Sequence, residues 1–366
     1  MCGGRTLPKS IRTLKIRLYP NREQEIRLLD TLSKCCHLYN SLLEYCRDCH
    51  EEGLKHPSAF DMMAALPQRK REDPSLKTVY SQVLEDVCSR VSGAFDGFFR
   101  RAKENAGDPG YPRFRSWKRY DSFTYPQSGF KLSKDRLILS PDKQSIRIRG
   151  YRKMEGKIKT CIVIRKGCAP NYRWGAAVTF ESETKTKKTS QPRRAVGIDM
   201  GLKNLVVTSE GREYPNSKEF VKAERQLSKI QRKMTRYEKG SPGRERNCQR
   251  LFHAFDKLND KRRGMMYEII NDLVDDHDMI VMEDLHTRKM TEKSLGKGMR
   301  KSYRDASWSK FMFILGYKAE EAGVLLVKVD PQYTSQRCSG CGILVPKDLS
   351  VRRHQCPHCG LDVDRD

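Results

Sequence analysis

The sequence predicts a multidomain protein of α/β and α+β architecture, on three observations. Its 366 residues are enough for two or three domains. In the first half, short runs of alternating apolar and polar residues lie on either side of a helical block. From residue 195 onward the predicted order is a strand hairpin, helices, a strand, a helix and a strand, which is typical of an α/β sheet.

In the first half, the sequence predicts a strand, then a helical block and then a group of strands. Leu14, Ile16 and Leu18 alternate with basic residues, which predicts a half-buried strand that ends at Pro20. Asn21 with Gln24 predicts a helix cap, and apolar residues at helical spacing continue to about residue 105. Short alternating runs then recur to about residue 180, which predicts a small antiparallel barrel. If the first strand joins this barrel, the helical block is an insertion.

Residues 105–129, "NAGDPGYPRFRSWKRYDSFTYPQSG", interleave aromatic residues with Arg and Lys. Such a mixture suits a surface that stacks on nucleobases and follows phosphates. The alternative is that these aromatic residues belong to the core, and we expect this for about half of them.

Two long helical patterns follow the polar linker "SETKTKKTSQPRR" and the first strand hairpin of the second half. Their apolar residues recur with a near-heptad period, and the segment "KGSPGRERN" joins them. We therefore expect an antiparallel helical hairpin with basic outer faces, whose apolar stripe is its own seam. The residues of the two stripes are Phe220, Leu227, Ile230, Met234 and Tyr237, and Leu251, Phe255, Leu258, Met265 and Ile269.

The formal charge of +26 predicts a polyanionic partner, because so much like charge destabilises a compact chain on its own. Nucleic acid is favoured over an anionic membrane surface, since each Lys or Arg gains affinity for phosphates by counterion release. No apolar run is long enough to span a bilayer and no signal-peptide pattern is present. We expect a cytoplasmic protein with reduced cysteines that acts on DNA. The haem-attachment pattern Cys46-x-x-Cys49-His50 lies within a helical pattern, so we expect ordinary helix residues there.

Two acids end otherwise apolar strands of the second half. Asp199 closes the first strand, just before the turn at Gly201, and Glu283 closes "MIVME". A carboxylate at such a place is unfavourable to bury unless it is paired or binds a cation. Carboxylates that converge from neighbouring strands can hold hard cations in a two-metal site for phosphodiester hydrolysis. The alternative is that each acid is an exposed residue in a loop.

Four cysteines near the C-terminus form two pairs, Cys338 with Cys341 and Cys356 with Cys359. This spacing, with glycine beside each pair, predicts a closed structural zinc site with four thiolate ligands. His354 and His358 lie near the pairs. Since four thiolates complete the coordination shell, we expect both histidines at the surface or in contact with phosphate.

The chain ends "LDVDRD", directly after the second cysteine pair. We expect Asp366, rather than Asp364, to return to the sheet beside Asp199 and Glu283 as a third ligand. The zinc segment is then an insertion between the last strand and this acidic element. The alternative is an acidic C-terminus that compensates nearby arginines.

Taken together, these motifs resemble the TnpB family, transposon-encoded relatives of the type V CRISPR effector nucleases. The segments that carry the resemblance run in order along nearly the whole chain: "YPRFRSWKRYDSFTYPQ", "GIDMGLKNLVV", "IVMEDL", "SWSKF", "GYKAEEAG", "VDPQYTSQRCSGCG" and "CPHCGLDVDRD". The resemblance implies a RuvC-like nuclease domain of RNase H fold at 193–337 and 361–366, with a zinc ribbon at 338–360. It also implies a β-barrel wedge domain at 1–20 and 106–192 with a helical recognition domain at 21–105 inserted.

The same resemblance implies an RNA-guided, Mg²⁺-dependent DNA endonuclease. Asp199, Glu283 and Asp366 match the three RuvC acids, which are catalytic and bind magnesium in the family. The guide is an RNA from the transposon end, the target is DNA beside a short motif, and base pairing supplies the sequence specificity. Family members carry a further helix after the third acid, so we expect Asp366 to be the least firmly held ligand here. A monomer is expected.

Three other functions are disfavoured by the sequence. A transposase that acts directly on transposon ends is disfavoured, because neither an HUH pair nor a tyrosine-recombinase constellation is evident. A non-catalytic RNA-guided DNA-binding regulator is disfavoured by the presence of Asp199 and Glu283. A sugar-kinase-like ATPase shares the "GIDMG" strand turn, but the cysteine pairs and the charge argue against it.

Overall fold

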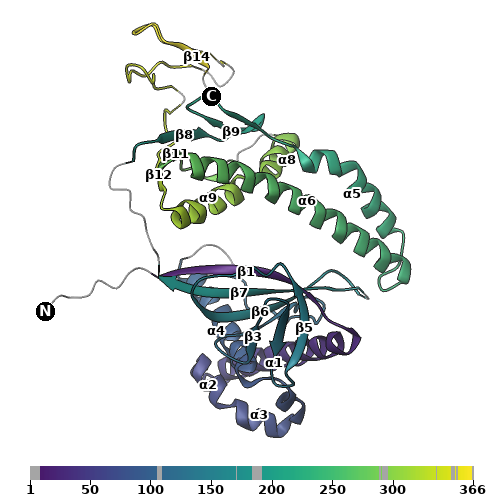
Figure 1. Ribbon diagram of the computed structural model, residues 1–366. Helices are drawn as coiled ribbons and strands as arrows, with labels where there is room; N and C mark the ends of the chain where they lie inside the picture. Colours follow the sequence, from purple (N-terminus) through teal and green to yellow (C-terminus); the bar gives the residue numbers. More distant parts are fainter. Residues whose placement is uncertain are drawn as a thin grey trace, which may run out of the picture. The chain divides into compact units, whose positions relative to one another are not determined.

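The computed structural model describes residues 9–104, 109–169, 171–183, 192–287, 290, 296–334, 336–347, 351 and 353–364 (Figure 1). The chain divides into two compact units, Met1–Thr184 and Lys185–Asp366. Each unit buries a hydrophobic core of its own.

Unit 1 contains a seven-stranded antiparallel sheet in the order β2-β6-β7-β1-β5-β4-β3. The first strand pairs with β7 on one side and with β5 on the other, so it joins the later strands as the sequence suggested. Its buried residues Leu14, Ile16 and Leu18 are those that the alternation placed inward. The strands are β1 (Lys9–Tyr19), β2 (Ser122–Tyr125), β3 (Phe130–Leu132), β4 (Arg136–Leu139), β5 (Gln144–Arg149), β6 (Lys157–Lys166) and β7 (Arg173–Glu183).

The two end strands of this sheet, β2 and β3, are not joined by a ladder of hydrogen bonds among the described residues. They meet through side chains instead, since the rings of Tyr125 and Phe130 contact each other with centroids 6.1 Å apart. The expected barrel is therefore closed by packing at this seam rather than by backbone pairing.

The helical block lies between β1 and β2. It comprises α1 (Arg22–Glu51), α2 (Ala59–Ala64), α3 (Leu66–Glu72), the 3₁₀ helix η1 (Pro74–Thr78) and α4 (Ser81–Lys103). The predicted cap of α1 is present as a capping box. The Gln24 backbone N–H donates to Asn21 Oδ1 at 2.8 Å, and the Asn21 N–H donates to Gln24 Oε1 at 3.0 Å. Gln24 Nε2 also donates to the carbonyl of Ser145 at 2.9 Å, which ties the start of α1 to β5.

Helices and sheet of unit 1 share one continuous core. Leu32 and Leu42 of α1 pack in the same cluster as Val87 of α4 and as Phe123 and Ile146 of the sheet. A single core of this kind makes the helical block part of the same packed body as the strands, although it is an insertion in the sequence.

Cys46 and Cys49 are both buried in α1, as expected for ordinary helix residues. Burial raises the pKa of Cys46 to about 11, so this thiol behaves as a small apolar side chain.

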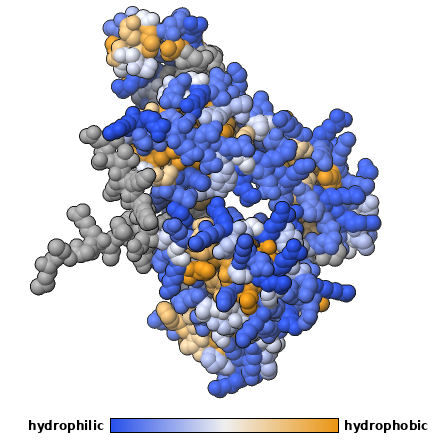
Figure 2. All heavy atoms as spheres, in the orientation of Figure 1, coloured by the Kyte–Doolittle hydropathy of each residue, from blue (hydrophilic) through white to orange (hydrophobic). Residues whose placement is uncertain are grey.

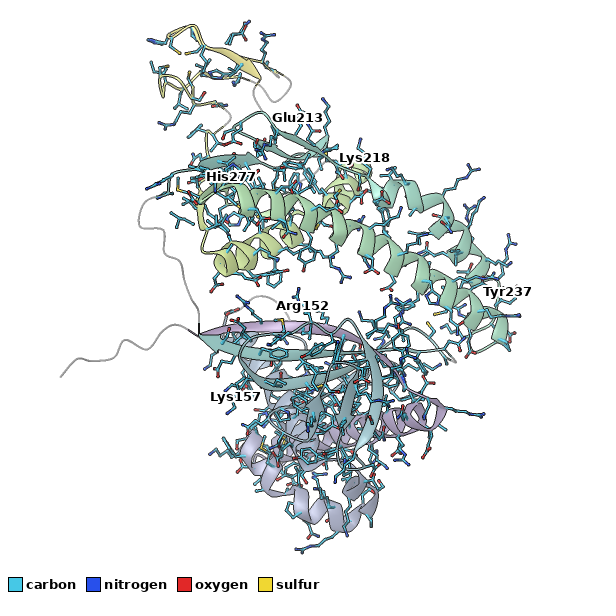
Figure 3. All side chains as sticks on the ribbon, viewed as in Figure 1. Arg152, Lys157, Glu213, Lys218, Tyr237 and His277 are labelled. Atoms are coloured by element: carbon cyan, nitrogen blue, oxygen red, sulfur yellow. The ribbon has the colours of Figure 1, made fainter. Side chains whose placement is uncertain are left out.

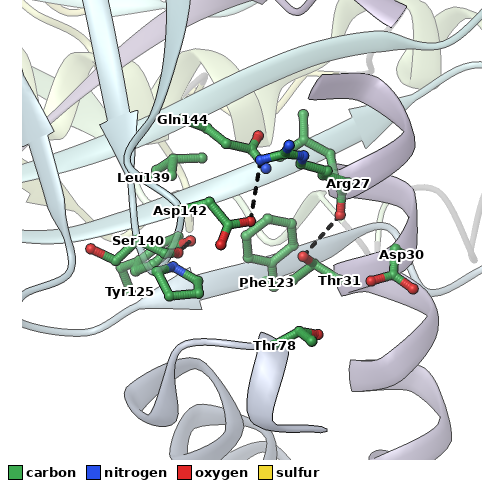
Figure 4. A pocket seen from close by; sticks show the side chains of 12 residues that line it. Arg27, Asp30, Thr31, Thr78, Phe123, Tyr125, Leu139, Ser140, Asp142 and Gln144 are labelled. Carbon is green, nitrogen blue, oxygen red and sulfur yellow. Dashed lines mark hydrogen bonds and ion pairs between the residues drawn. The ribbon is translucent and has the colours of Figure 1, made fainter. Parts of the chain in front are cut away.

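A small hollow lies between α1 and the sheet (Figure 4). Phe123, Tyr125 and Leu139 are among the residues that line it, and Arg27 pairs with Asp142 at 3.4 Å across it. Charged and polar side chains make up most of its lining, and its ion pair is exposed, so we interpret it as a packing junction between helix and sheet.

Unit 2 contains a five-stranded sheet in the order β10-β9-β8-β11-β12. Successive strands β8, β9 and β10 are antiparallel, whereas β11 runs parallel to both β8 and β12. Three antiparallel strands followed by two that run parallel to the first are the topology of the RNase H fold. The strands are β8 (Ala195–Asp199), β9 (Asn204–Thr208), β10 (Glu213–Pro215), β11 (Met279–Glu283) and β12 (Leu325–Val329).

The helices of unit 2 are α5 (Glu219–Thr235), α6 (Pro242–Asp276), α8 (Lys297–Ala306) and α9 (Trp308–Ala322). The first two form the predicted helical hairpin, and Figure 1 shows them side by side. Leu227 and Leu258 are buried along them. At the closed end, near Tyr237 in Figure 3, Arg244 Nη1 donates to the carbonyls of Met234 at 3.3 Å and Tyr237 at 3.0 Å.

The first turn of α5 is capped from a distant part of the sequence. Lys218, labelled in Figure 3, precedes the helix with φ +49° and supplies no side-chain cap. Asp305 at the end of α8 accepts instead from the Phe220 N–H at 3.2 Å and from Arg262 of α6. Asp305 is buried, and its Oδ1 accepts from both α5 and α6, so this one side chain links α5, α6 and α8.

The surface of each unit is mostly hydrophilic in the view of Figure 2, as the charge of +26 suggests. Within the residues described, no helix has both the length and the apolar character needed to cross a membrane.

Candidate functional site: an acid pair and a four-cysteine cluster

The first part of the candidate site is a pair of acids at neighbouring strand ends. Strand β11 runs parallel to β8 with Met282 opposite Ile198, so the next residues, Glu283 and Asp199, end their strands side by side. Val196, Ile198, Ile280 and Met282 are buried and fix both strands in the core. The two half-buried carboxylates are thereby held at one edge of the sheet, the edge where parallel strands end.

The environment of Glu283 disfavours its charged form. Burial raises the pKa of this carboxyl, and the neighbouring charge of Asp199 raises it further, while a hydrogen bond from Thr334 opposes both effects. Thr334 Oγ1 donates to Glu283 Oε1 from the segment that follows β12. Two like charges held this close are stabilised by a bound cation, and carboxylate oxygens are the ligands that Mg²⁺ prefers.

Thr334 was not identified from the sequence. It lies in the segment "VDPQYTSQRCSGCG", between the last strand of the sheet and the first cysteine pair, and nothing in that segment predicts a contact with Glu283. Its contact with Glu283 depends on how β12 pairs with β11, which only the folded chain shows.

The expected third ligand, Asp366, lies outside the described residues. Strand β14 (Asp362–Asp364) ends two residues before it, and the side chain of Asp364 is not described either. The structure therefore brings together two of the three predicted acids.

The second part of the site is the four-cysteine cluster. The Sγ atoms of Cys338, Cys341, Cys356 and Cys359 all lie within 4.8 Å of one another. Two pairs, Cys338 with Cys359 and Cys341 with Cys356, have Sγ atoms 3.6 Å apart. A tetrahedral zinc ion with Zn–S bonds of about 2.3 Å requires sulfur atoms roughly 3.8 Å apart, so the cluster has the spacing of a closed zinc site.

The two cysteine pairs are built alike. The N–H of Gly342 donates to the Cys338 carbonyl at 2.8 Å, and the N–H of Gly360 donates to the Cys356 carbonyl at 3.0 Å. Both glycines adopt left-handed φ angles, +75° and +73°, which side chains with a Cβ rarely adopt. In each turn, backbone N–H groups donate to a cysteine sulfur, Cys341 in the first and Cys356 in the second.

Among the four thiols, Cys356 is the one whose ionised form the backbone favours most clearly. Hydrogen bonds from the N–H groups of Cys359 and His358 lower the pKa of Cys356 to about 6. A thiolate is the form that binds metal, so this turn is prepared for a cation.

One prediction for this segment is wrong. His354 is buried rather than at the surface, because it is the inward residue of β13 (Arg353–Gln355), which pairs with β14. Its Nδ1 contacts Lys347 Nζ inside the segment. His358, in the second turn, is exposed as expected.

Three family models match the chain. The model described as "Probable transposase" matches residues 177–294, which include both acids. The model "Cas12f1-like, TNB domain" matches residues 308–366, which include the cysteine cluster. A "Helix-turn-helix domain" model matches residues 10–55, where the structure has β1 and the single long helix α1.

Two similar proteins align with nearly the whole chain. "Putative RNA-guided DNA endonuclease InsQ" of Escherichia coli K12 is 27% identical over 364 residues, which cover 95% of this chain and 88% of that protein. A "Putative RNA-guided DNA endonuclease" of Streptomyces pristinaespiralis is 29% identical over 361 residues, which cover 97% and 86%.

Solved structures share the fold. A Cas12f1 complex with guide RNA and target DNA aligns with TM-score 0.55 and 14% identity over 93% of this chain and 92% of that one. The endonuclease CRISPR-Cas_phi3 aligns with TM-score 0.51 and 9% identity over 100% and 92%. With the acids and cysteines in the order of the sequence motifs, the chain is similar to proteins of the TnpB family along nearly its whole length.

Proposed function

We propose that this protein is an RNA-guided DNA endonuclease. The observation that carries the proposal is the meeting of Asp199 and Glu283 at adjacent ends of parallel strands in a sheet of RNase H topology. The names of the two relatives that span most of the chain support a guided DNA endonuclease.

In this proposal Asp199 and Glu283 are catalytic residues that bind magnesium, with Asp366 as third ligand. When bound, two magnesium ions would supply an activated water and stabilise the leaving oxygen of the phosphodiester. Asp199 and Glu283 would hold their carboxylates at fixed positions on two hydrogen-bonded strands, so little reorganisation is needed on substrate binding. Thr334 would fix the rotamer of Glu283 through its hydroxyl.

Zinc in the four-cysteine cluster is part of the same proposal, with a structural role. The four thiolates complete a tetrahedral shell, so the ion would have no open position for substrate. It would hold together residues 338–360, where His354 is the one buried side chain besides cysteines among the residues described.

The partners in this proposal are a guide RNA from the transposon end and a DNA target beside a short motif. The charge of +26 supplies the phosphate contacts that both nucleic acids require, and pairing with the guide supplies sequence specificity. We assign the wedge domain to residues 1–20 and 106–192, with the recognition domain at 21–105. The nuclease domain is assigned to 193–337 and 361–366, and the ribbon to 338–360. The acting unit is a monomer in the cytoplasm.

Asp199→Ala tests the proposal. The complex with guide RNA is purified, and cleavage of a matched plasmid is timed in Mg²⁺ while guide and target binding are measured separately. We expect cleavage to fall by more than the roughly 10–100-fold that outer-shell residues of metal sites produce, with both affinities kept. Asp275→Ala, an exposed acid in the last turn of α6, is the matched control and should cleave normally.

Cleavage by Asp199→Ala at the wild-type rate would show that the acid pair is not the reaction centre. Wild-type protein that cleaves equally well without a guide would instead contradict the RNA-guided part of the proposal and favour direct action on DNA.

A further inference from the structure

A surface loop in unit 1 combines cations with exposed aromatic rings. In residues 113–119, which we call the stacking loop, all seven residues are exposed. Phe114 and Trp117 keep 49% and 39% of their surface in contact with solvent. The flanking cations are Arg113, Arg115, Lys118 and Arg119. The other half of the aromatic segment behaves differently, since Tyr120, Phe123 and Tyr125 are buried in the core.

Each exposed ring is backed by an arginine from a regular element. The Arg47 guanidinium of α1 lies over the Phe114 ring, 4.6 Å from its centroid. The Arg165 guanidinium of β6 lies over Trp117 at 4.2 Å and over Tyr172 at 4.8 Å. An arginine therefore covers one face of each loop ring, while the ring remains partly open to solvent.

The loop backbone is clamped in this position. Asn40 of α1 accepts from the Arg115 N–H at 2.9 Å and donates to the Arg115 carbonyl at 2.9 Å. Arg165, which is buried, donates to the Trp117 carbonyl at 2.8 Å. A loop held in this way loses little conformational entropy when a ligand binds to it.

Rigid aromatic faces set among cations match the chemistry of a single nucleic-acid strand. Every nucleobase has a π-face that can stack on an aromatic ring, and the phosphates on either side of it carry negative charge. The loop has four cations and no acidic residue, and this excess of positive charge favours a phosphate backbone over a protein partner.

We propose that the stacking loop binds a single-stranded segment of nucleic acid, with one unpaired base on Trp117 and another on Phe114. The cations of the loop contact the phosphates. This inference rests on the proposed function only in taking nucleic acid as the partner. The single strand belongs either to the guide RNA or to the DNA, which share this chemistry.

The chain provides its own spectroscopic probe. It has three tryptophans, of which Trp174 and Trp308 are buried at 2% and 5% exposure. Trp117 alone of the three is exposed. A base stacked on it should quench the solvent-exposed part of the fluorescence, whereas binding elsewhere should leave that signal unchanged.

The test titrates the full chain with 12-nucleotide oligo(U) and oligo(dT), following tryptophan fluorescence and the anisotropy of a labelled strand. We expect the wild-type fluorescence to be quenched. In Trp117→Ala the affinity should be about tenfold weaker, while the slope of log affinity against log salt concentration stays unchanged. Trp117→Phe keeps a ring and should bind nearly as wild type. Lys118→Ala should lower the salt slope by about 0.7, as the loss of one phosphate contact on a single strand does.

Phe313→Ala is the matched control, because this side chain is 74% exposed but lies in unit 2. It should leave the affinity unchanged. Tighter binding of oligo(U) would assign the loop to RNA, and tighter binding of oligo(dT) would assign it to DNA.

Wild-type affinity in Trp117→Ala, or binding without quenching, would overturn the inference and leave the nuclease proposal intact. A wild-type protein that quenches but never cleaves would support the inference while contradicting the nuclease proposal.

Discussion

The acid pair and the cysteine cluster of unit 2 are assembled in opposite ways. The cysteines come from two short turns of the same design, each closed by its own glycine and backbone hydrogen bonds. The acids come from two strands that are distant in sequence and meet only because β11 pairs with β8. A site built from local turns therefore depends on its ligand for stability, whereas a site built on a sheet depends on the core beneath it.

The largest effect on stability is expected when the cysteine cluster loses its zinc ion. Cys338→Ser removes one of four thiolates, and structural zinc in small domains contributes about 10–16 kcal/mol of binding free energy that also drives folding. We expect the variant to lose zinc in metal analysis and to lose hydrogen-exchange protection across β13 and β14. Unit 1 should keep its protection, because its core contains no part of this cluster.

Ser339→Ala is the matched control, since this residue is exposed in the same turn and its side chain is not a ligand. Wild-type protein purified without zinc, or Cys338→Ser with a full complement of zinc, would contradict the assignment.

The same contrast explains what the sequence could predict. The capping box of Asn21 and Gln24 and the spacing of the four cysteines are local patterns, and both have the predicted geometry. The meeting of Asp199 and Glu283 was foreseeable only because ends of strands in one sheet can converge. Asp305 and Thr334 were missed because their partners belong to distant segments.

The remaining differences between the predictions from sequence and the structure arise from how the strands pair. His354 was expected at the surface, but the alternation of β13 turns it inward. The small barrel was predicted from alternating runs, yet whether its end strands share backbone hydrogen bonds depends on the packing of Tyr125 and Phe130. Sequence periodicity indicates which face of a strand is buried, and it contains no information on how a sheet closes.

An intermediate effect is expected at Asp305, the distant cap of α5. Asp305→Ala leaves the Arg262 charge buried without its carboxylate and the Phe220 N–H without its acceptor. Breaking a buried pair in this way typically lowers the free energy of unfolding by about 3–5 kcal/mol. Urea denaturation followed by Trp308 fluorescence, with Trp117 and Trp174 replaced by Phe in every variant compared, measures the loss in unit 2.

Asn21→Ala is the matched comparison in unit 1, where the cap is local and exposed, and its unfolding is followed by Trp174 fluorescence with Trp117 and Trp308 replaced by Phe. Loss of such a cap costs about 1 kcal/mol. Asp305→Asn, which keeps an acceptor oxygen, should fall between wild type and Asp305→Ala. Equal losses for Asp305→Ala and Asn21→Ala would show that the distant cap contributes no more than a local one.

The smallest effect is expected at Thr334, where the segment leading to the cysteine cluster meets the acid pair. Thr334→Val keeps the shape of the side chain but removes the hydroxyl that donates to Glu283. Because this hydrogen bond lowers the pKa of Glu283, its loss should raise that pKa further, so protons compete better with Mg²⁺.

We expect more Mg²⁺ to be needed for half-maximal cleavage by Thr334→Val, with the larger increase at pH 6 and a smaller one at pH 8. Since this hydrogen bond is exposed and such bonds are worth about 0.5–1.5 kcal/mol, the increase at pH 6 should be at most about tenfold. Thr334→Ser keeps the hydroxyl and should restore the wild-type Mg²⁺ dependence. An increase in Thr334→Val that is the same at both pH values would mean that the residue acts through packing, and the two sites would then be joined by shape rather than by this hydrogen bond.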